Sequence, residues 1–182
     1  MKALMILENG FEDTEALASF DVLKRAGFDV TTASLDCTNI VSQCGHSVSS
    51  AILVKDIKDL NVFDFLVIPG GKAVFNVLDK RKEIDDLIDF FYFKNKLIAC
   101  ICAAPMLVGK RGYFKGLSYT CFPGCDTNIK EGKKGEDGVI EDGNFITATS
   151  MYYSIPFALK IVEHFKGTKY KDEILNSLKG IR

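Results

Sequence analysis

The segment that decides the fold is Leu97-Ile98-Ala99-Cys100-Ile101-Cys102-Ala103-Ala104-Pro105-Met106. Its apolar run 97–101 is typical of a short buried strand, and residues 103–107 are typical of the first turn of a helix. Pro105 suits that place because an early helical position needs no partner for its backbone N–H. Cys102 therefore lies at a sharp strand-to-helix junction. This is the geometry of a nucleophile elbow, with cysteine in the position where hydrolases carry serine.

The junction predicts a reactive thiol at Cys102. Free backbone N–H groups and the positive end of the helix dipole would point at the sulfur, and both favour the thiolate over the thiol. The alternative is that Cys102 is one more buried small residue, which is the usual state of a free cysteine. The local sequence leaves both interpretations open.

Strands alternate with helices on both sides of this junction. A strand over 2–7, a helix from Thr14 to Gly27 and a strand over 28–34 form a βαβ unit, which implies a parallel sheet. A continuously apolar strand over 63–68 is expected at the centre of that sheet. The pattern predicts an α/β doubly wound sandwich with a mostly parallel central sheet. The other expected elements are a hairpin around Gly45-His46-Ser47, a helical linker over 54–60, helices over 72–78 and 80–93, a short strand over 117–121, a long loop over 122–138, a hairpin over 139–147, and helices over 154–165 and 170–178.

Composition bounds the class of protein. A chain of 182 residues with 47% hydrophobic and 26% charged residues predicts one domain with one core. A formal net charge of −1 gives no indication of a nucleic-acid partner, and no apolar run is long enough to span a bilayer. The stretch Met1 to Leu7 is too short for a signal peptide and is followed by Glu8, so a cytoplasmic protein is expected.

The six cysteines are expected to be reduced thiols, with neither disulfides nor a metal site. Cys100 lies within the expected strand and Cys102 at the point where the chain turns into the helix, so the two thiols are not expected to share one ion. Cys121 and Cys125 have no histidine at zinc-like spacing. Since the chain also lacks a phosphate-binding loop, no cofactor is predicted. The other two cysteines are Cys37 and Cys44.

Three chemically suggestive features follow expected strands. They are the segment 8–15, the pair Gly70-Gly71 and Cys102. Because the carboxyl ends of parallel strands lie at one edge of a sheet, the three features should converge there. Two adjacent glycines also let a backbone approach a ligand closely and expose its N–H groups.

Six motifs follow one another along nearly the whole chain. They are Glu12-Asp13-Thr14-Glu15, Lys24-Arg25-Ala26-Gly27, Ile68-Pro69-Gly70-Gly71, the segment 99–105, Thr120-Cys121-Phe122-Pro123-Gly124 and the segment 157–163. In these motifs and their order the sequence resembles the ThiJ/PfpI superfamily, in the branch of the parkinsonism-associated protein deglycase. This resemblance implies a single flavodoxin-like domain over residues 1–182, a homodimer, and a reactive cysteine at the elbow.

The resemblance also implies roles for individual residues. Cys102 takes the position of the reactive cysteine, and Glu15 that of a glutamate close to its sulfur. A carboxylate beside a thiolate should have a raised pKa, and its protonated form can donate a hydrogen bond to sulfur. The alternative for Glu15 is an acid paired with the helix dipole. Gly70 and Gly71 would supply N–H donors for an oxyanion, with Ala103 as a further substrate-binding candidate.

This chain also departs from the family pattern. Many relatives carry a histidine in the loop before the proline of 121–124, and this chain has Phe122 there. His46 is either the missing base or an exposed turn residue, and His164 is expected to be structural. The segment 150–154 replaces a turn rich in glycine and proline, so a bulkier, more aromatic pocket wall is expected.

Two functions of different class follow. The first is a cysteine-dependent, cofactor-free enzyme of the glyoxalase or deglycase type, which converts a small 2-oxoaldehyde to a 2-hydroxy acid. The second is a redox-responsive regulatory or chaperone-like protein in which Cys102 is oxidised without turnover, with Cys121 as a possible resolving thiol. The missing loop histidine weakens acid–base turnover and leaves thiol oxidation untouched.

Overall fold

The computed structural model describes residues 1–181, and it confirms an α/β flavodoxin-like fold built on one mostly parallel sheet. The strand order is β10-β11-β7-β6-β1-β2-β5, and all neighbours are parallel except β10 and β11. The strands are β1 (Lys2–Ile6), β2 (Asp29–Ser34), β5 (Ile52–Leu53), β6 (Phe65–Ile68), β7 (Leu97–Ile101), β10 (Val139–Asp142) and β11 (Phe145–Ala148).

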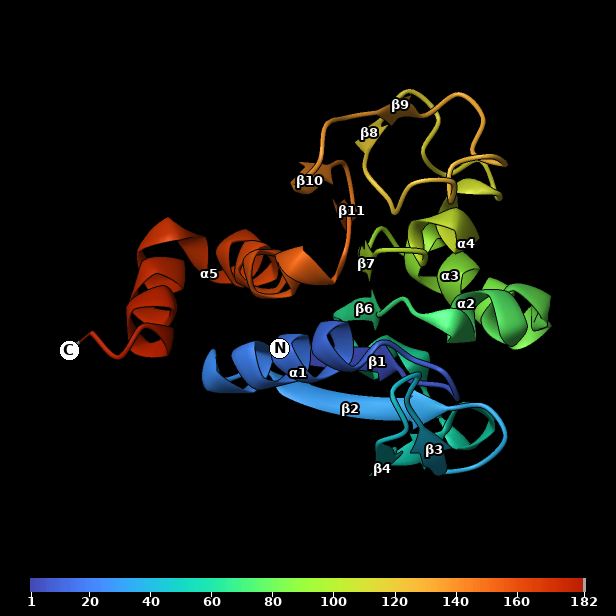
Figure 1. Cartoon of the computed structure of the whole chain (residues 1–182), viewed down its shortest axis with the longest axis horizontal. Coiled ribbons are helices and arrows are strands. Elements are labelled where there is room, and N and C mark those ends of the chain that lie inside the picture. Colours follow the sequence, from blue (N-terminus) through green and yellow to red (C-terminus); the bar gives the residue numbers. More distant parts are fainter. Residues whose placement is uncertain (182) are drawn as a thin grey trace.

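Helices cover both faces of the sheet (Figure 1). One face carries α1 (Asp13–Arg25) and α5 (Ser154–Leu178). The other carries α2 (Lys72–Asn76), α3 (Lys82–Phe93) and α4 (Pro105–Gly109). The two helices expected over 154–165 and 170–178 are the two arms of α5, which bends at Gly167, where φ is 81°. Only glycine adopts that backbone conformation readily.

The alternation of side chains along each strand explains why these runs are apolar throughout. Ala3 and Met5 pack in the core beneath α1 and α5, while Leu4 and Ile6 point to the opposite core beneath α3. A parallel strand with helices on both faces has no solvated side, so every position favours a hydrophobic residue.

The edges of the sheet differ from the sequence expectation. The first hairpin is shorter than expected, consisting of β3 (Asn39–Val41) and β4 (Ser47–Ser49). Ile52 and Leu53 leave it and pair with β2 as the edge strand β5. The expected linker helix is two 3₁₀ turns, Val54–Asp56 and Leu60–Val62. Short irregular pieces of this kind are decided by tertiary contacts rather than by local pattern.

The segment expected to be one long loop, 122–138, contains a short strand. β9 (Lys133–Lys134) pairs in parallel with β8 (Ser118–Tyr119) in a small separate sheet. β8 is therefore not part of the central sheet. Two further 3₁₀ turns, Leu78–Lys80 and Met151–Tyr153, precede α3 and α5.

The strand order places the crevice of the sheet. β1 lies between β2 and β6. The chain therefore adds β2 on one side of β1 and later adds β6 on its other side, so the direction of strand addition reverses at β1. In open α/β sheets, ligands bind outside the carboxyl ends of the strands at such a reversal. Among residues 1–181, no helix combines the length and apolar character that crossing a membrane requires.

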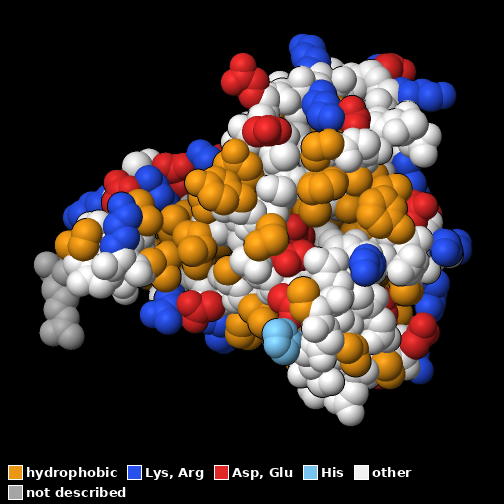
Figure 2. Space-filling view, in the orientation of Figure 1, with side chains coloured by type: hydrophobic (Ala, Val, Ile, Leu, Met, Phe, Trp, Pro, Cys, Tyr) orange, Lys and Arg blue, Asp and Glu red, His pale blue; other side chains and the backbone are white. Residues whose placement is uncertain are grey.

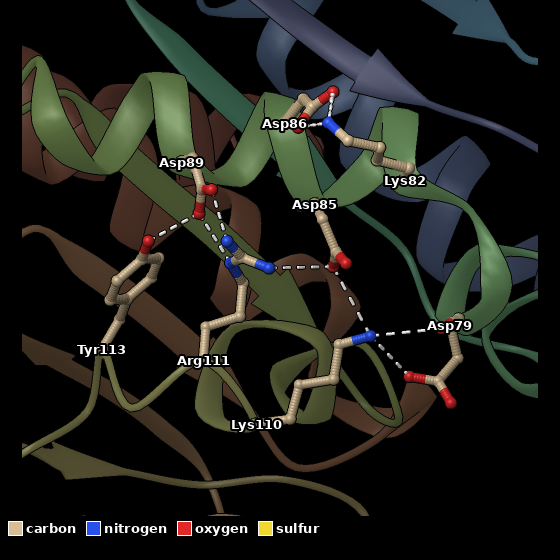
Figure 3. Close-up of polar contacts among 8 residues, drawn as sticks. All are labelled: Asp79, Lys82, Asp85, Asp86, Asp89, Lys110, Arg111 and Tyr113. Atoms are coloured by element: carbon tan, nitrogen blue, oxygen red, sulfur yellow. Dashed lines mark hydrogen bonds and ion pairs between the residues drawn. The ribbon is translucent and has the colours of Figure 1, made fainter.

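An ion-pair network ties α3 to the turn after α4 (Figure 3). Asp89 accepts hydrogen bonds from Arg111 Nε at 2.6 Å and from the Tyr113 hydroxyl at 2.5 Å. Lys110 Nζ lies 2.9 Å from Asp79 Oδ1 and 3.5 Å from Asp85 Oδ1. These side chains are half-buried, so water screens their interactions only in part.

Removal of the Asp89 carboxylate should destabilise the fold. Asp89→Ala leaves Arg111 and Tyr113 without their shared acceptor, and the expected loss is about 2 kcal/mol. Thermal unfolding should then move down by roughly 4–8 °C. Asp86→Ala is the matched control on the same helix, since Asp86 pairs only with the exposed Lys82 and should change stability by less than about 0.5 kcal/mol. Equal melting temperatures for the two variants would contradict the structural role of the network.

Candidate functional site

Cys102 has the backbone of a nucleophile elbow. Its φ is 64°, a left-handed conformation that costs energy in a non-glycine residue. Two hydrogen bonds hold it there: its N–H donates to the Ala148 carbonyl at 2.9 Å, and its carbonyl accepts from the Phe122 N–H at 2.8 Å. Residues 102–104 form a turn and α4 begins only at Pro105, two residues later than expected.

Glu15 is buried beside the elbow. It lies in the first turn of α1, where its N–H donates to the N-cap carboxylate of Glu12 at 2.7 Å. Its own Oε2 accepts the Gly70 N–H at 2.7 Å. Its Oε1 has no nitrogen or oxygen partner within residues 1–181, and the group facing this carboxyl is the Cys102 thiol. Glu15 lies in the first turn of α1, as the helix-dipole alternative requires, but it is buried and its carboxyl also faces the thiol, as the resemblance implies.

The protonation of Glu15 and Cys102 is coupled. Burial raises the pKa of Glu15 to about 7, although the Cys102 thiol and the Gly70 N–H oppose this shift. The expected rise is confirmed, but its main cause is loss of water rather than repulsion by sulfur.

The expectation of a lowered thiol pKa is not met. Burial first, and then the negative charge of Glu15, raise the pKa of Cys102, while the N–H groups of Ala103 and Gly71 lower it by less. Near neutral pH the Cys102 thiol therefore keeps its proton, while Glu15 is divided between its protonated and ionised forms.

The role predicted for Gly70 needs correction. Its N–H is occupied by Glu15, so it cannot also serve an oxyanion. Gly70 is glycine because a Cβ there would lie 2.8 Å from both the Cys102 Cβ and the Glu15 Oε2. The N–H groups of Gly71 and Ala103 do approach the sulfur. These two N–H groups remain available to a substrate oxygen that becomes negatively charged when the sulfur attacks its carbonyl carbon.

These residues open onto a pocket of about 260 Å³. In Figure 2 hydrophobic side chains gather near the centre of the face shown, on both sides of a small group of acidic side chains. Most of the wall is apolar and the acids lie beside the thiol. The pocket is lined by Glu12, Glu15, Gln43, Gly71, Lys72, Phe75, Cys102, Ala103, Phe122, Ser150 and Met151.

The other candidate residues lie outside this pocket. The exposed His46 ring contacts Asp13 Oδ1 at 2.6 Å, so it is an exposed turn residue rather than a base beside the thiol. Cys121 is buried near Cys100, burial raises its pKa to about 12, and it does not line the pocket. Its expected role as a resolving thiol has no geometric support. His164 Nδ1 pairs with Glu141 at 2.6 Å, in keeping with a structural role.

Sequence reasoning missed part of the pocket wall. Gln43, Lys72 and Phe75 were not among the expected site residues, although all three line the pocket. Lys72 and Phe75 lie on α2, which begins directly after Gly71 at the ligand-binding edge of the sheet. The position of a helix immediately after the glycine pair was the signal that could have identified them.

Comparisons with known proteins agree with this geometry. The sequence pattern described as the DJ-1/PfpI family matches residues 1–164. The chain is 34% identical over 182 residues to Drosophila melanogaster protein dj-1beta, covering 97% of this chain and 95% of that protein. The crystal structure of that relative superposes with a TM-score of 0.89, covering 100% of this chain and 98% of the other.

Two further comparisons bear on function. A Pyrococcus horikoshii protein named deglycase PH1704 is 32% identical over 150 residues, covering 81% of this chain and 89% of its own length. A structure described as oxidized Toxoplasma gondii DJ-1 has a TM-score of 0.88 at 25% identity, with 97% of each chain covered.

Proposed function

This chain belongs to the DJ-1/PfpI family, and from that premise we propose that it is a cysteine-dependent, cofactor-free enzyme that converts small 2-oxoaldehydes to 2-hydroxy acids. The observation that carries the proposal is the pairing of the partly exposed Cys102 thiol with the buried Glu15 carboxyl at the wall of a pocket. A relative that bears the name deglycase supports the same class of chemistry.

The first step is attack of the Cys102 sulfur on the aldehyde carbon. As the C–S bond forms, the thiol proton passes to the Glu15 carboxylate, whose pKa of about 7 suits a base at neutral pH. The aldehyde oxygen becomes an oxyanion close to the N–H groups of Gly71 and Ala103, which donate to it. Protonation of this oxygen by Glu15 gives a hemithioacetal.

The second step moves hydrogen between the two carbons. Glu15, again ionised, removes the proton from the former aldehyde carbon and returns it to the neighbouring carbonyl carbon through an enediol. The hydroxyl proton of the hemithioacetal passes to the former ketone oxygen in the same rearrangement. The aldehyde carbon is thereby oxidised to a thioester while the ketone is reduced to an alcohol, so no external oxidant or reductant is required. Water then hydrolyses the thioester, releasing the 2-hydroxy acid and restoring the thiol.

The test is the formation of lactate from methylglyoxal by the purified protein without glutathione. Turnover above the buffer rate, proportional to protein concentration, is the expected result. Absence of a 2-hydroxy acid product from methylglyoxal and from every bulkier 2-oxoaldehyde, over a range of pH from 6 to 9, would reject the proposal, because that range includes both protonation states of Glu15.

A redox-responsive role is the second candidate. Cys102 is partly exposed, and the N–H groups of Gly71 and Ala103 that approach its sulfur would also stabilise a sulfinate. The oxidized form described for Toxoplasma gondii DJ-1 supports this candidate. Oxidation to the sulfinate adds two oxygens from two peroxide molecules, each reduced to water. Intact-mass analysis after peroxide treatment separates the two functions, since selective oxidation of Cys102 in a protein inert toward methylglyoxal supports only the redox role.

A further inference from the structure

Three large apolar side chains from separate parts of the chain line the pocket. Phe75 comes from α2, Phe122 from the loop after β8 and Met151 from the 3₁₀ turn before α5. Their exposed fractions are 47%, 46% and 49%. Single exposed apolar residues are ordinary, but three around one pocket beside a reactive thiol indicate a surface that a ligand covers.

The backbone fixes the position of this wall relative to the reactive sulfur. The Phe122 N–H donates to the Cys102 carbonyl at 2.8 Å, so the residue that replaces the family's loop histidine is attached directly to the elbow. A substrate whose aldehyde carbon reaches the sulfur therefore lies in the same pocket as the Phe122 side chain. Phe75 and Met151 line the same pocket and would contact the substrate as well.

The charges of the pocket argue against an anionic tail on the substrate. Glu12 and Glu15 both line the pocket. Among residues 1–181, the only cationic side chain that lines it is that of Lys72, which is exposed to solvent. An exposed lysine contributes little to binding, because water screens its charge and its side chain is mobile. Apolar contact is the larger source of binding free energy here.

The volume of the pocket also favours a substrate larger than methylglyoxal. A space of 260 Å³ corresponds to about nine water molecules at ~30 Å³ each. Methylglyoxal would leave much of this space to water and would not cover the three apolar side chains. A 2-oxoaldehyde with an aryl or branched alkyl substituent would fill more of this space and cover more of the apolar wall.

We propose that the site is built for 2-oxoaldehydes bearing an aryl or bulky apolar substituent, with Phe122 and Phe75 as specificity-determining residues. This inference rests on the proposed function and retains its reaction. The substituent on the ketone carbon takes no part in bond making or breaking, and the product is the corresponding 2-aryl or 2-alkyl 2-hydroxy acid.

The experiment compares phenylglyoxal with methylglyoxal as substrates of the wild type, Phe122→Ala and Phe75→Ala. The wild type should have a kcat/KM for phenylglyoxal at least about tenfold above that for methylglyoxal. Each alanine variant should reduce this ratio by about tenfold, mainly through a lower kcat/KM for phenylglyoxal. Alanine retains the backbone N–H that binds Cys102, so the elbow should persist in Phe122→Ala.

Phe93→Ala is the matched control, because Phe93 is exposed on α3 and does not line the pocket. It should leave the ratio unchanged. If both aldehydes are turned over at equal kcat/KM, or if the ratio is the same in all variants, the specificity inference is wrong while the proposed function stands. If neither aldehyde is turned over, the proposed function itself fails.

Discussion

The Cys102→Ser variant is expected to lose at least about a thousandfold in kcat/KM toward 2-oxoaldehydes, which corresponds to roughly 4 kcal/mol of transition-state stabilisation. A hydroxyl oxygen of similar size replaces the sulfur, but its proton is far harder to remove. Glu15, with a pKa of about 7, can take a proton from a thiol during attack and is too weak a base to do the same for serine.

The fold should survive this substitution, which makes the loss of activity interpretable. Serine retains the backbone N–H and carbonyl that bind Ala148 and Phe122. The melting temperature should therefore stay close to that of the wild type. Cys37→Ser is the matched control, since Cys37 is exposed and its thiol contacts only the Asn39 carbonyl at 3.1 Å. A Cys102→Ser protein with wild-type turnover would remove the thiol from the mechanism.

The elbow was predictable because its determinants are local. A buried apolar strand, one cysteine and a proline at the first turn of a helix specify the junction within ten residues, and Cys102 has the strained φ that an elbow requires. The doubly wound, mostly parallel sheet was predictable from the alternation of strands and helices, whereas the full strand order comes from the structure. Glu15 and Gly71 were placed correctly at the same edge of the sheet, because the carboxyl ends of parallel strands always lie at one edge. That placement depends on topology and not on the positions of individual side chains.

The roles of individual hydrogen-bonding groups could not be predicted. The sequence shows that Gly70 and Gly71 follow a strand, but only the geometry shows that the first N–H is taken by Glu15 and the second remains free for the site. The pKa of Cys102 was misjudged for a related reason. The backbone donors near the sulfur are a local feature, whereas its burial and its distance from Glu15 depend on the packing of α1 against the sheet.

The Glu15→Gln variant should lose turnover by at least about a hundredfold while its fold becomes more stable at neutral and alkaline pH. Glutamine retains a carbonyl oxygen that can accept the Gly70 N–H, so the shape of the site is preserved. It cannot take the proton of the Cys102 thiol. The kcat/KM of the wild type should rise between pH 6 and 8 with an apparent pKa near 7 that belongs to the Cys102–Glu15 pair, and the residual activity of the variant should lack that rise.

The stability of the same variant gives an independent measurement with a defined sign. Burial raises the pKa of Glu15 from 4.5 to about 7, so between these values the folded chain holds a proton that the unfolded chain has released. Unfolding free energy contributed by this group therefore falls as pH rises from 4.5 to 7, by roughly 3 kcal/mol in total. Glutamine does not ionise, so in Glu15→Gln this contribution to the unfolding free energy should no longer fall as pH rises. Denaturant unfolding at pH 5 and pH 8 should show Glu15→Gln gaining stability over the wild type only at the higher pH. An equal difference at both pH values would mean that Glu15 is not the buried titrating acid of the site.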